Sequence, residues 1–308
     1  MLGRIVEVGN DNRHLSVYRG FLLIQSKGPG PWQEIGRIPL DDILAVIVNA
    51  HGVSYTNNIL EALADRGVPF VLSSDRHVPV AFLWPLEGHH LQAKRMECQL
   101  NASLPRKKNV WAAIVRSKIL MQAQVLRMFG KPHGAMENYA RDVRSGDPDN
   151  REALAARFYW SALFGDDFRR DRLAAGANVF LNYGYTILRS AMARAVIAAG
   201  LHPSVGVHHC NDGNSQRLVD DLMEPFRPLV DAKVALLKPE VDSELTPEGK
   251  KALVSVLHVD MRCPTGRTPV SVAMQQLAAS LAQIFTEERT KLDLPEGFIF
   301  DDLREKNS

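Results

Sequence analysis

Cysteine is scarce in this chain, with three residues among 308: Cys98, Cys210 and Cys263. They are odd in number and show no Cys-x-x-Cys spacing, which argues against a disulfide framework and against a zinc site built from thiolates. The amino terminus also lacks a basic segment followed by an apolar one, so no signal peptide is expected. Together these absences predict a cytoplasmic protein in a reducing compartment.

Long hydrophobic runs are missing as well. The most apolar long stretch, residues 173–188, is interrupted by Asn178, Asn182 and Thr186. It is shorter than the roughly 20 apolar residues of a membrane helix, so no membrane association is expected. With 45% hydrophobic and 23% charged residues, the composition is that of a globular protein and excludes collagen-like and low-complexity classes. A chain of this length holds one or two compact domains.

Several motifs of nucleotide and hydrolase chemistry are absent. There is no Gly-x-Gly-x-x-Gly after a strand, no Gly-rich phosphate loop ending in Lys-Ser or Lys-Thr, no Gly-x-Ser-x-Gly and no His-Glu-x-x-His. Nucleotide-driven enzymes and serine hydrolases are therefore disfavoured. The remaining candidates are carboxylates and histidines in the second half of the chain.

Acidic residues are absent from one segment, residues 98–136, although the whole chain carries a net charge of only +2. Locally clustered cations of this kind are typical of a surface that binds a polyanion. The alternative is a solvated helix face. The segment contains seven basic residues: Arg106, Lys107, Lys108, Arg116, Lys118, Arg127 and Lys131.

The hydrophobic spacing divides the chain in two. Residues 1–84 read as short strands separated by turns, with a helix over residues 57–65, which predicts a small β-rich, β-sandwich-like domain. Residues 4–8, 14–18 and 21–25 have the pattern of a β meander. Residues 85–90 read as a linker, because beyond them the apolar period changes from about 2 to about 3.6. Candidate helices cover residues 91–99, 108–129, 150–164, 177–199, 216–225, 247–259 and 268–286. We therefore expect an α+β multidomain protein whose larger domain, residues 91–308, is all-α.

Glu152 lies near the start of a very apolar predicted helix, and Tyr159 returns to the same face seven residues later. Asp149 and Glu152 also have the spacing of a capping box, in which Glu152 would only reach back to a backbone N–H. The spacing alone favours the cap over a functional carboxylate, and both interpretations stay open.

A second polar cluster contains the adjacent His208 and His209 and the carboxylates of Asp221 and Glu224. Asp221 and Glu224 are three residues apart, so on a helix both face one way. Like charges in this arrangement are unfavourable unless a cation lies among them. Carboxylates with an imidazole suit Mg²⁺ or Mn²⁺ better than softer ligand sets do. The alternative is a solvated acidic helix face beside a surface histidine pair.

Six segments together resemble one known family, the CRISPR-associated integrase and endonuclease of spacer acquisition, which is the larger of the two universal adaptation proteins. The resemblance covers nearly the whole chain. The sequence of residues 221–228, Asp-Leu-Met-Glu-Pro-Phe-Arg-Pro, is most similar to that of type II members, and among them to the II-C subgroup. The matching segments are residues 38–48, 67–71, 152–157, 181–185, 206–209 and 221–231.

The resemblance implies that Glu152, His209 and Glu224 form the catalytic set and hold Mg²⁺ or Mn²⁺, with Asp221 at a second acidic position. Glu224 stands where many relatives have Asp. The implied activity is that of a metal-dependent DNA endonuclease and integrase, which inserts short DNA fragments into a CRISPR array by 3′-hydroxyl transesterification. The β-rich domain would mediate dimerisation, and residues 91–308 would bind metal and DNA.

The resemblance also implies partners: double-stranded DNA fragments, CRISPR repeat DNA, a second copy in a homodimer and the small second adaptation protein. No organic cofactor is implied. Two alternatives remain, a noncatalytic DNA-binding scaffold of the adaptation complex and a metal-dependent phosphoesterase of small substrates. The acid-free segment would hold the DNA backbone, through Arg106, Lys107, Lys108, Arg116 and Lys118.

Overall fold

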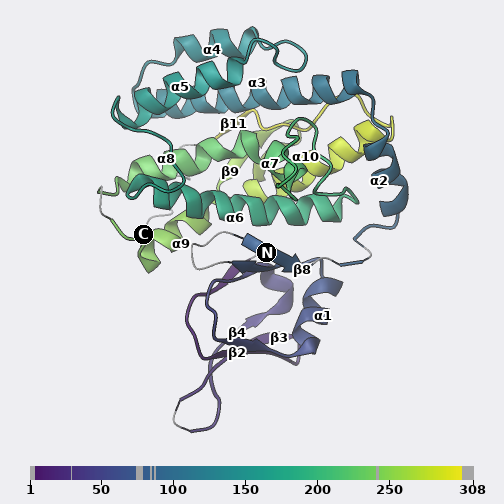
Figure 1. The fold of residues 1–308 in the computed structure, drawn as a ribbon, viewed down its shortest axis with the longest axis vertical. Coiled ribbons are helices and arrows are strands. Elements are labelled where there is room, and N and C mark those ends of the chain that lie inside the picture. The colour runs from purple at the N-terminus through teal and green to yellow at the C-terminus, as the bar shows by residue number, and fades with distance from the viewer. Residues whose placement is uncertain are drawn as a thin grey trace. The chain divides into compact units, whose positions relative to one another are not determined.

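The computed structural model describes residues 4–28, 30–73, 79–83, 85–86, 88–240 and 243–299. It divides into two compact units, Met1–His90 and Leu91–Ser308, here called the amino-terminal and carboxyl-terminal units (Figure 1). The predicted mixture of helices and strands is confirmed. Residues 84 and 87, at the end of the predicted β-rich domain and in the predicted linker, lie outside the described ranges. Within those ranges, the helices are all too short or too polar to cross a membrane.

In its described residues, the amino-terminal unit contains two four-stranded sheets, one α-helix and one 3-10 helix. Its elements are β1 (Arg4–Val8), β2 (Arg13–Tyr18), β3 (Phe21–Ser26), β4 (Gln33–Pro39), η1 (Leu40–Asp42), β5 (Ile43–Val48), β6 (Val53–Tyr55), α1 (Asn57–Asp65), β7 (Phe70–Ser73) and β8 (Pro79–Leu83). The sheet orders are β1-β5-β7-β8 and β4-β3-β2-β6. Buried residues of both sheets and of α1 form one hydrophobic core, and β5 is buried along its whole length.

The first strand does not belong to a meander, contrary to the sequence prediction. β2, β3 and β4 pair antiparallel in chain order, but β1 pairs in parallel with β5 in the other sheet. Val6 and Val8 of β1 are buried beside β5. The alternation of apolar residues predicts which face of a strand is buried but not which strand lies next to it, so this pairing could not be inferred from the pattern.

Helices dominate the carboxyl-terminal unit. Its elements are α2 (Gln92–Leu100), α3 (Leu104–Met128), α4 (Gly134–Arg141), α5 (Arg151–Phe164), α6 (Ala177–Ala198), α7 (Arg217–Met223), η2 (Glu224–Phe226), α8 (Arg227–Leu237), α9 (Pro247–Val254), η3 (Ser255–His258), β9 (Asp260–Cys263), β10 (Gly266–Pro269), α10 (Val270–Phe285) and β11 (Gly297–Phe298). Helices α4 and α8 were not predicted. As Figure 1 shows, α3 runs beside α4 and α5, while α6 contacts α7, α8, α9 and α10.

The carboxyl-terminal unit is not all-α, which corrects the sequence prediction. Strands β9 and β10 form a hairpin with a two-residue turn, and β11 pairs with the other edge of β9. Residues 255–258, predicted as the end of a helix, form a 3-10 turn before this hairpin. Strands of two to four residues are too short for a period of two to be distinguished from helical spacing.

Helices α6 and α8 approach closely because α6 carries Gly184 at their contact. A Cβ atom at Gly184 would collide with the Val230 side chain, so the absence of a side chain permits this approach. Tyr185 and Asp231 follow these two residues and share a hydrogen bond of 2.5 Å between the tyrosine hydroxyl and the carboxylate. The close contact thus brings polar groups of both helices together inside the unit.

Candidate metal centre

Glu152 lies at the start of α5 but does not cap it. The Asp147 carboxylate accepts hydrogen bonds from the backbone N–H groups of Arg151 (2.9 Å) and Glu152 (3.0 Å), and it therefore satisfies the free donors of the helix start. Asp149, which the capping-box spacing paired with Glu152, instead binds the Arg144 guanidinium. The capping interpretation is wrong, and the Glu152 carboxylate is available to a cation.

That cation is the ammonium group of Lys118. Lys118 Nζ donates to Glu152 Oε1 at 2.6 Å and lies 2.5 Å from Glu224 Oε2. The three side chains come from α3, α5 and η2, which are distant in sequence. Burial alone would lower the pKa of Lys118, but the nearby Glu224 and Glu152 carboxylates raise it above its usual value. Lys118 is therefore a buried, charged bridge between two carboxylates, not an exposed group facing solvent.

Glu224 has one oxygen that lacks a hydrogen bond. The side chain is buried, and its Oε1 lies 2.9 Å from Arg227 Nε. Burial alone would raise the pKa of Glu224, but Arg227 and Lys118 lower it, so the carboxyl is ionised. Within the described ranges, Oε2 accepts no hydrogen bond; its contact with Lys118 is an ion pair without hydrogen-bond alignment. A buried carboxylate oxygen whose partner is a single cation suits a metal ligand, because a divalent ion can replace the ammonium there.

Asp221 holds the turn that carries His209. Its fully buried carboxylate accepts the backbone N–H groups of Val207 (2.6 Å) and His208 (3.0 Å), and it lies 2.5 Å from His209 Nδ1. Gly206 permits the turn, because a Cβ there would lie 2.8 Å from the His209 carbonyl oxygen. The Asp221 hydrogen bond raises the pKa of His209. With Nδ1 held, Nε2 is available, as in the carboxylate–histidine pairs of metal sites.

The neighbouring His208 makes a different contact. Its ring stacks in parallel on the buried Trp111, with the centroids 4.2 Å apart and 2° between the planes. His209 instead lies near enough to Glu224 and Glu152 for both charges to raise its pKa. The geometry therefore supports His209, and not His208, as the imidazole of this centre.

The donor set of Glu152, Glu224 and His209 fits a divalent cation. Carboxylate oxygens with one imidazole are suited to Mg²⁺ or Mn²⁺, and the two carboxylates already hold one cation between them, the Lys118 ammonium. In the described part of the chain, no group of three His, Cys, Asp or Glu side chains is already arranged to hold an ion, because Lys118 lies between the two glutamates. Asp221 directs both oxygens to the 206–209 turn, so it positions His209 and is not a first choice as a ligand.

If a metal binds Glu152 and Glu224, Lys118 must leave both, and we then expect Lys118→Met to tighten Mn²⁺ binding by about tenfold. The reason is that the ion no longer has to break charge-assisted contacts worth about 1.5–3 kcal/mol. Without added metal the variant should be less stable than wild type, since the buried Glu224 and the half-buried Glu152 lose a counter-ion. Titration calorimetry measures the affinity. Lys108→Met, on an exposed part of the same helix, is the control; unchanged or weaker binding in Lys118→Met would contradict the displacement.

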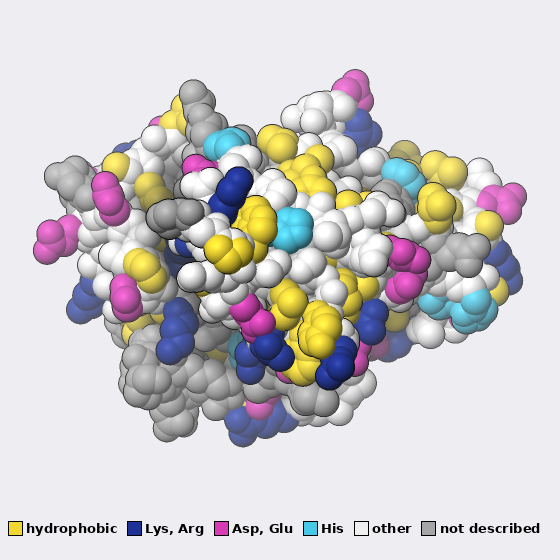
Figure 2. All heavy atoms as spheres, turned by 90° about the horizontal axis from the view of Figure 1, so that it is seen from below, with side chains coloured by type: hydrophobic (Ala, Val, Ile, Leu, Met, Phe, Trp, Pro, Cys, Tyr) yellow, Lys and Arg dark blue, Asp and Glu magenta, His cyan; other side chains and the backbone are white. Residues whose placement is uncertain are grey.

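The predicted DNA-binding cations are largely paired in space. Arg106 forms a 2.6 Å ion pair with Glu287, and Arg116 donates to main-chain carbonyls of residues 140 and 143. Lys107 and Lys108 form no ion pair with residues that the structure describes. Elsewhere on the protein, on the face drawn in Figure 2, described basic side chains also lie among acidic and apolar ones. A segment without acids in sequence is thus partly neutralised by acids from elsewhere.

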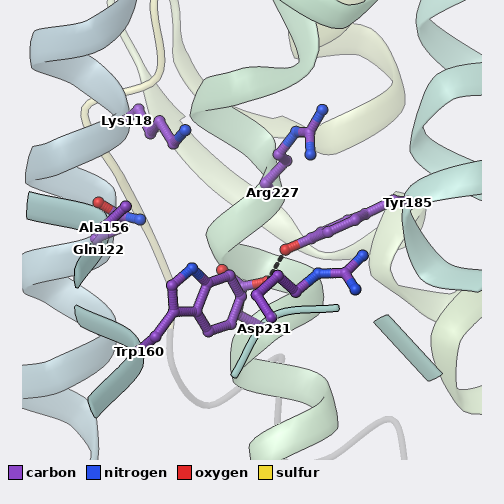
Figure 3. Close-up of a pocket in the computed structure, with 8 residues that line it drawn as sticks. Lys118, Gln122, Ala156, Trp160, Tyr185, Arg227 and Asp231 are labelled. Atoms are coloured by element: carbon purple, nitrogen blue, oxygen red, sulfur yellow. Dashed lines mark hydrogen bonds between the residues drawn. The ribbon is translucent and has the colours of Figure 1, made fainter. Parts of the chain in front are cut away.

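A polar cavity borders the centre, and of its lining residues sequence reasoning gave a role only to Lys118, as a DNA contact. It has a volume of about 130 Å³ and shares Lys118 and Arg227 with the metal centre (Figure 3). On its wall, the buried Asp231 carboxyl accepts hydrogen bonds from Tyr159 and Tyr185. The asparagines that interrupt the apolar stretch 173–188 were the indication in the sequence that polar groups lie here. The other lining residues are Gln122, Ala156, Trp160 and Arg170.

Comparisons with known proteins agree with this architecture. A family model described as CRISPR associated protein Cas1 matches residues 7–240. A CRISPR-associated endonuclease Cas1 of Neisseria meningitidis serogroup C (strain 8013) is 37% identical over 287 residues, which are 92% of each chain. A Cas1 endonuclease of Pyrobaculum aerophilum is 31% identical, covering 74% of this chain and 80% of its own.

Solved structures share the fold. A casposase bound to integration product has a TM-score of 0.79 at 20% identity and covers 98% of both chains. A chain of a Cas6-RT-Cas1--Cas2 complex has a TM-score of 0.71 at 17% identity, covering 95% of this chain and 36% of that one. A Cas1 protein from Thermotoga maritima has a TM-score of 0.70 at 16% identity, over 92% of this chain and 97% of that one. By its sequence match and its fold, this chain belongs to the Cas1 family of CRISPR-associated proteins.

Proposed function

We propose that this protein is a metal-dependent DNA endonuclease and integrase, which inserts short DNA fragments into a CRISPR array. The observation that carries the proposal is the meeting of Glu152 and Glu224 at one cation, beside a histidine oriented by Asp221. The relative from Neisseria meningitidis is named an endonuclease, and the casposase structure is described with its integration product. Both descriptions agree with phosphodiester chemistry at this centre.

The reaction is a transesterification at phosphorus. A 3′-hydroxyl oxygen attacks a phosphodiester, the bond to the departing 3′-oxygen breaks, and negative charge develops on the phosphoryl oxygens. A divalent ion held by Glu152, Glu224 and His209 supplies Lewis-acid stabilisation of that charge. Arg227, and Lys118 once it is released from the two glutamates, contribute positive charge beside the ion. Water in place of the 3′-hydroxyl gives cleavage without joining.

The same proposal extends to partners. The protein acts on double-stranded DNA fragments and CRISPR repeat DNA, forms a homodimer through its β-rich amino-terminal unit, and binds the small second adaptation protein. The likeness to a chain of a Cas1–Cas2 complex supports the last of these. We also propose a cytoplasmic location. We assign the protein to the type II branch because of the sequence of residues 221–228 and the 37% identity with the Neisseria relative.

Strand transfer with Mn²⁺ on branched and supercoiled DNA tests the proposed function. We expect joining of a fragment with a free 3′-hydroxyl, and nicking, both dependent on the metal. A noncatalytic scaffold would bind the same DNA and neither nick nor join it. A phosphoesterase of small substrates would hydrolyse a nitrophenyl phosphate ester and leave DNA intact. Either outcome would overturn the proposal.

Lys107 and Lys108 provide a test of the DNA-binding segment that does not depend on the chemistry. Each phosphate contact on duplex DNA contributes about −0.9 to the slope of log affinity against log salt. We expect the double variant Lys107→Gln/Lys108→Gln to reduce the magnitude of this slope by up to about 1.8, similarly on unrelated sequences. Fluorescence anisotropy measures it.

Arg106→Gln is the matched control, because Arg106 is already paired with Glu287. This variant should therefore change the slope of log affinity against log salt less than the double variant does. An unchanged slope in the double variant would mean that the segment is a solvated face.

A further inference from the structure

The cavity beside the metal centre has the size and lining of an anion site. At about 130 Å³, it is smaller than the roughly 300 Å³ of a pocket for a drug-sized ligand, so it suits one small group. Figure 3 shows Lys118 and Arg227 near one end and Trp160 on the opposite wall, with the Tyr185 hydroxyl directed at Asp231. Three cationic side chains line the cavity: Lys118, Arg170 and Arg227.

Arg170 is the cation of this set that no described carboxylate binds. Its two terminal nitrogens donate to Asn178 Oδ1 (2.9 Å) and Asn182 Oδ1 (2.7 Å), which are neutral amides one turn apart on α6. Its guanidinium also lies over the Tyr185 ring, 5.3 Å from the centroid. A guanidinium has five N–H donors, so several remain for a ligand after these contacts. The side chain is thus fixed in position but not neutralised.

Asp231 offsets only part of this positive charge. Both of its oxygens accept hydrogen bonds from buried tyrosines, Tyr159 on α5 and Tyr185 on α6. Burial raises the pKa of Asp231 to about 7, against the effect of these hydrogen bonds and of Arg227 and Arg170. Near neutral pH the carboxyl is therefore protonated in a large fraction of molecules, and an anion in the cavity meets less repulsion.

Metal binding would increase the positive charge of the cavity. In the structure Lys118 is bound by Glu152 and Glu224, and Arg227 by Glu224. A divalent ion that takes both carboxylates leaves Lys118 and Arg227 with weaker partners, so three cations then face one carboxyl. An anion gains most in this state, which is the state in which phosphoryl transfer occurs.

We propose that Arg170 binds a phosphodiester group of the DNA in this cavity, next to the phosphate that reacts at the metal. The inference rests on the proposed function and names a substrate contact of the same site. The ligand is one anionic phosphate on a flexible strand. This phosphate belongs either to the strand that carries the attacking 3′-hydroxyl or to the strand that is cut. Trp160 forms the apolar wall against which the adjoining sugar packs.

Single methylphosphonate linkages, which are neutral replacements of a phosphodiester, locate such a contact. One series of DNA substrates carries the linkage at successive positions before the attacking 3′-end, and a second series carries it around the cut site. Affinity is measured by anisotropy for wild type, Arg170→Gln and Arg169→Gln. Arg169 is the matched control, because it is exposed and donates only to main-chain carbonyls of residues 166 and 168.

We expect one position in one series to weaken binding of wild type and Arg169→Gln by about tenfold or more, as for a hydrogen bond to a charged group. In Arg170→Gln that position should change affinity less than about twofold, while unmodified DNA binds about tenfold more weakly. The ratio of modified to unmodified DNA within one variant does not depend on the folded fraction. Arg170→Lys, which keeps the charge, should retain part of the sensitivity.

Identical methylphosphonate profiles in wild type and Arg170→Gln would overturn the assignment. Strand transfer by wild type is measured in parallel to separate the two proposals. If wild type joins DNA and the profiles are identical, only the Arg170 contact is wrong. If wild type shows the Arg170-dependent position but neither nicks nor joins DNA, the contact stands and the proposed function is wrong.

Discussion

Glu152→Gln, Glu224→Gln and His209→Phe should each reduce metal-dependent strand transfer by about 10³-fold or more. Gln preserves the shape of Glu but removes the charge that would hold a divalent ion, and Phe removes the Nε2 that Asp221 leaves available by binding Nδ1. Residues that act as one unit are not additive, so a double variant should be little worse than either single one. Single-turnover strand transfer at saturating Mn²⁺ measures the loss, and anisotropy checks that DNA binding persists.

Matched controls separate the centre from its surroundings. Asp149→Asn removes the same charge three residues before Glu152, from a carboxylate that binds Arg144 outside the centre, and should be active. His208→Phe keeps an aromatic ring on Trp111 and should also be active. A variant of Glu152, Glu224 or His209 that stays within a few-fold of wild type is not a ligand. A dead His208→Phe with an active His209→Phe would transfer the ligand role to His208.

Glu152 illustrates what local spacing can and cannot predict. The Asp149–Glu152 spacing matched a capping box, yet the acceptor at the helix start is Asp147. A helix cap depends on the path of the preceding turn, and several nearby acids satisfy the same spacing. The functional interpretation of Glu152 came from the resemblance to a family. Its contact with a lysine 34 residues away could not be read from the helix alone.

The acid-free segment shows a similar limit. Its charge was correctly counted, but the partners of its cations are distant in sequence: Glu224 for Lys118 and Glu287 for Arg106. Local charge patterning detects i,i+3 and i,i+4 pairs and misses pairs made by tertiary packing. Lys118, predicted to contact DNA, is bound by Glu152 and Glu224 inside the centre.

The sequence predicted the secondary-structure elements better than it predicted how the strands pair. The bounds of β1 and α1 follow directly from apolar runs and turn residues. Strand order, the short hairpin of β9 and β10, and helix α8 were not predictable in the same way. α8 follows η2 with only Glu224–Phe226 between it and α7, and Pro225 and Pro228 conceal its start.

Asp221→Asn should weaken metal binding by about 10- to 100-fold, the usual cost of losing the partner that orients a metal-binding histidine. The wild-type carboxylate accepts two N–H groups of the turn on Oδ2 and binds the His209 ring through Oδ1. An amide of the same shape directs an N–H₂ group at one of these partners, so the turn loses a bond and His209 is less firmly held. Asp221 contacts no reacting atom and acts as a positioning residue.

The pH dependence distinguishes positioning of His209 from general loss of stability. A metal binds the neutral imidazole, and the Asp221 hydrogen bond raises the pKa of His209, so in wild type protons compete with the metal up to a higher pH. Asp221→Asn should lower that pKa, and the midpoint of metal affinity against pH should move to lower pH while the plateau affinity falls. Nuclear magnetic resonance titration of the His209 ring without metal measures the pKa directly.

Asp220→Asn is the control, because this neighbouring buried carboxylate binds Arg189. Its loss should destabilise the fold without moving the midpoint of metal affinity against pH. A His209 pKa that is the same in wild type and Asp221→Asn would show that Asp221 supports the turn but does not tune its histidine.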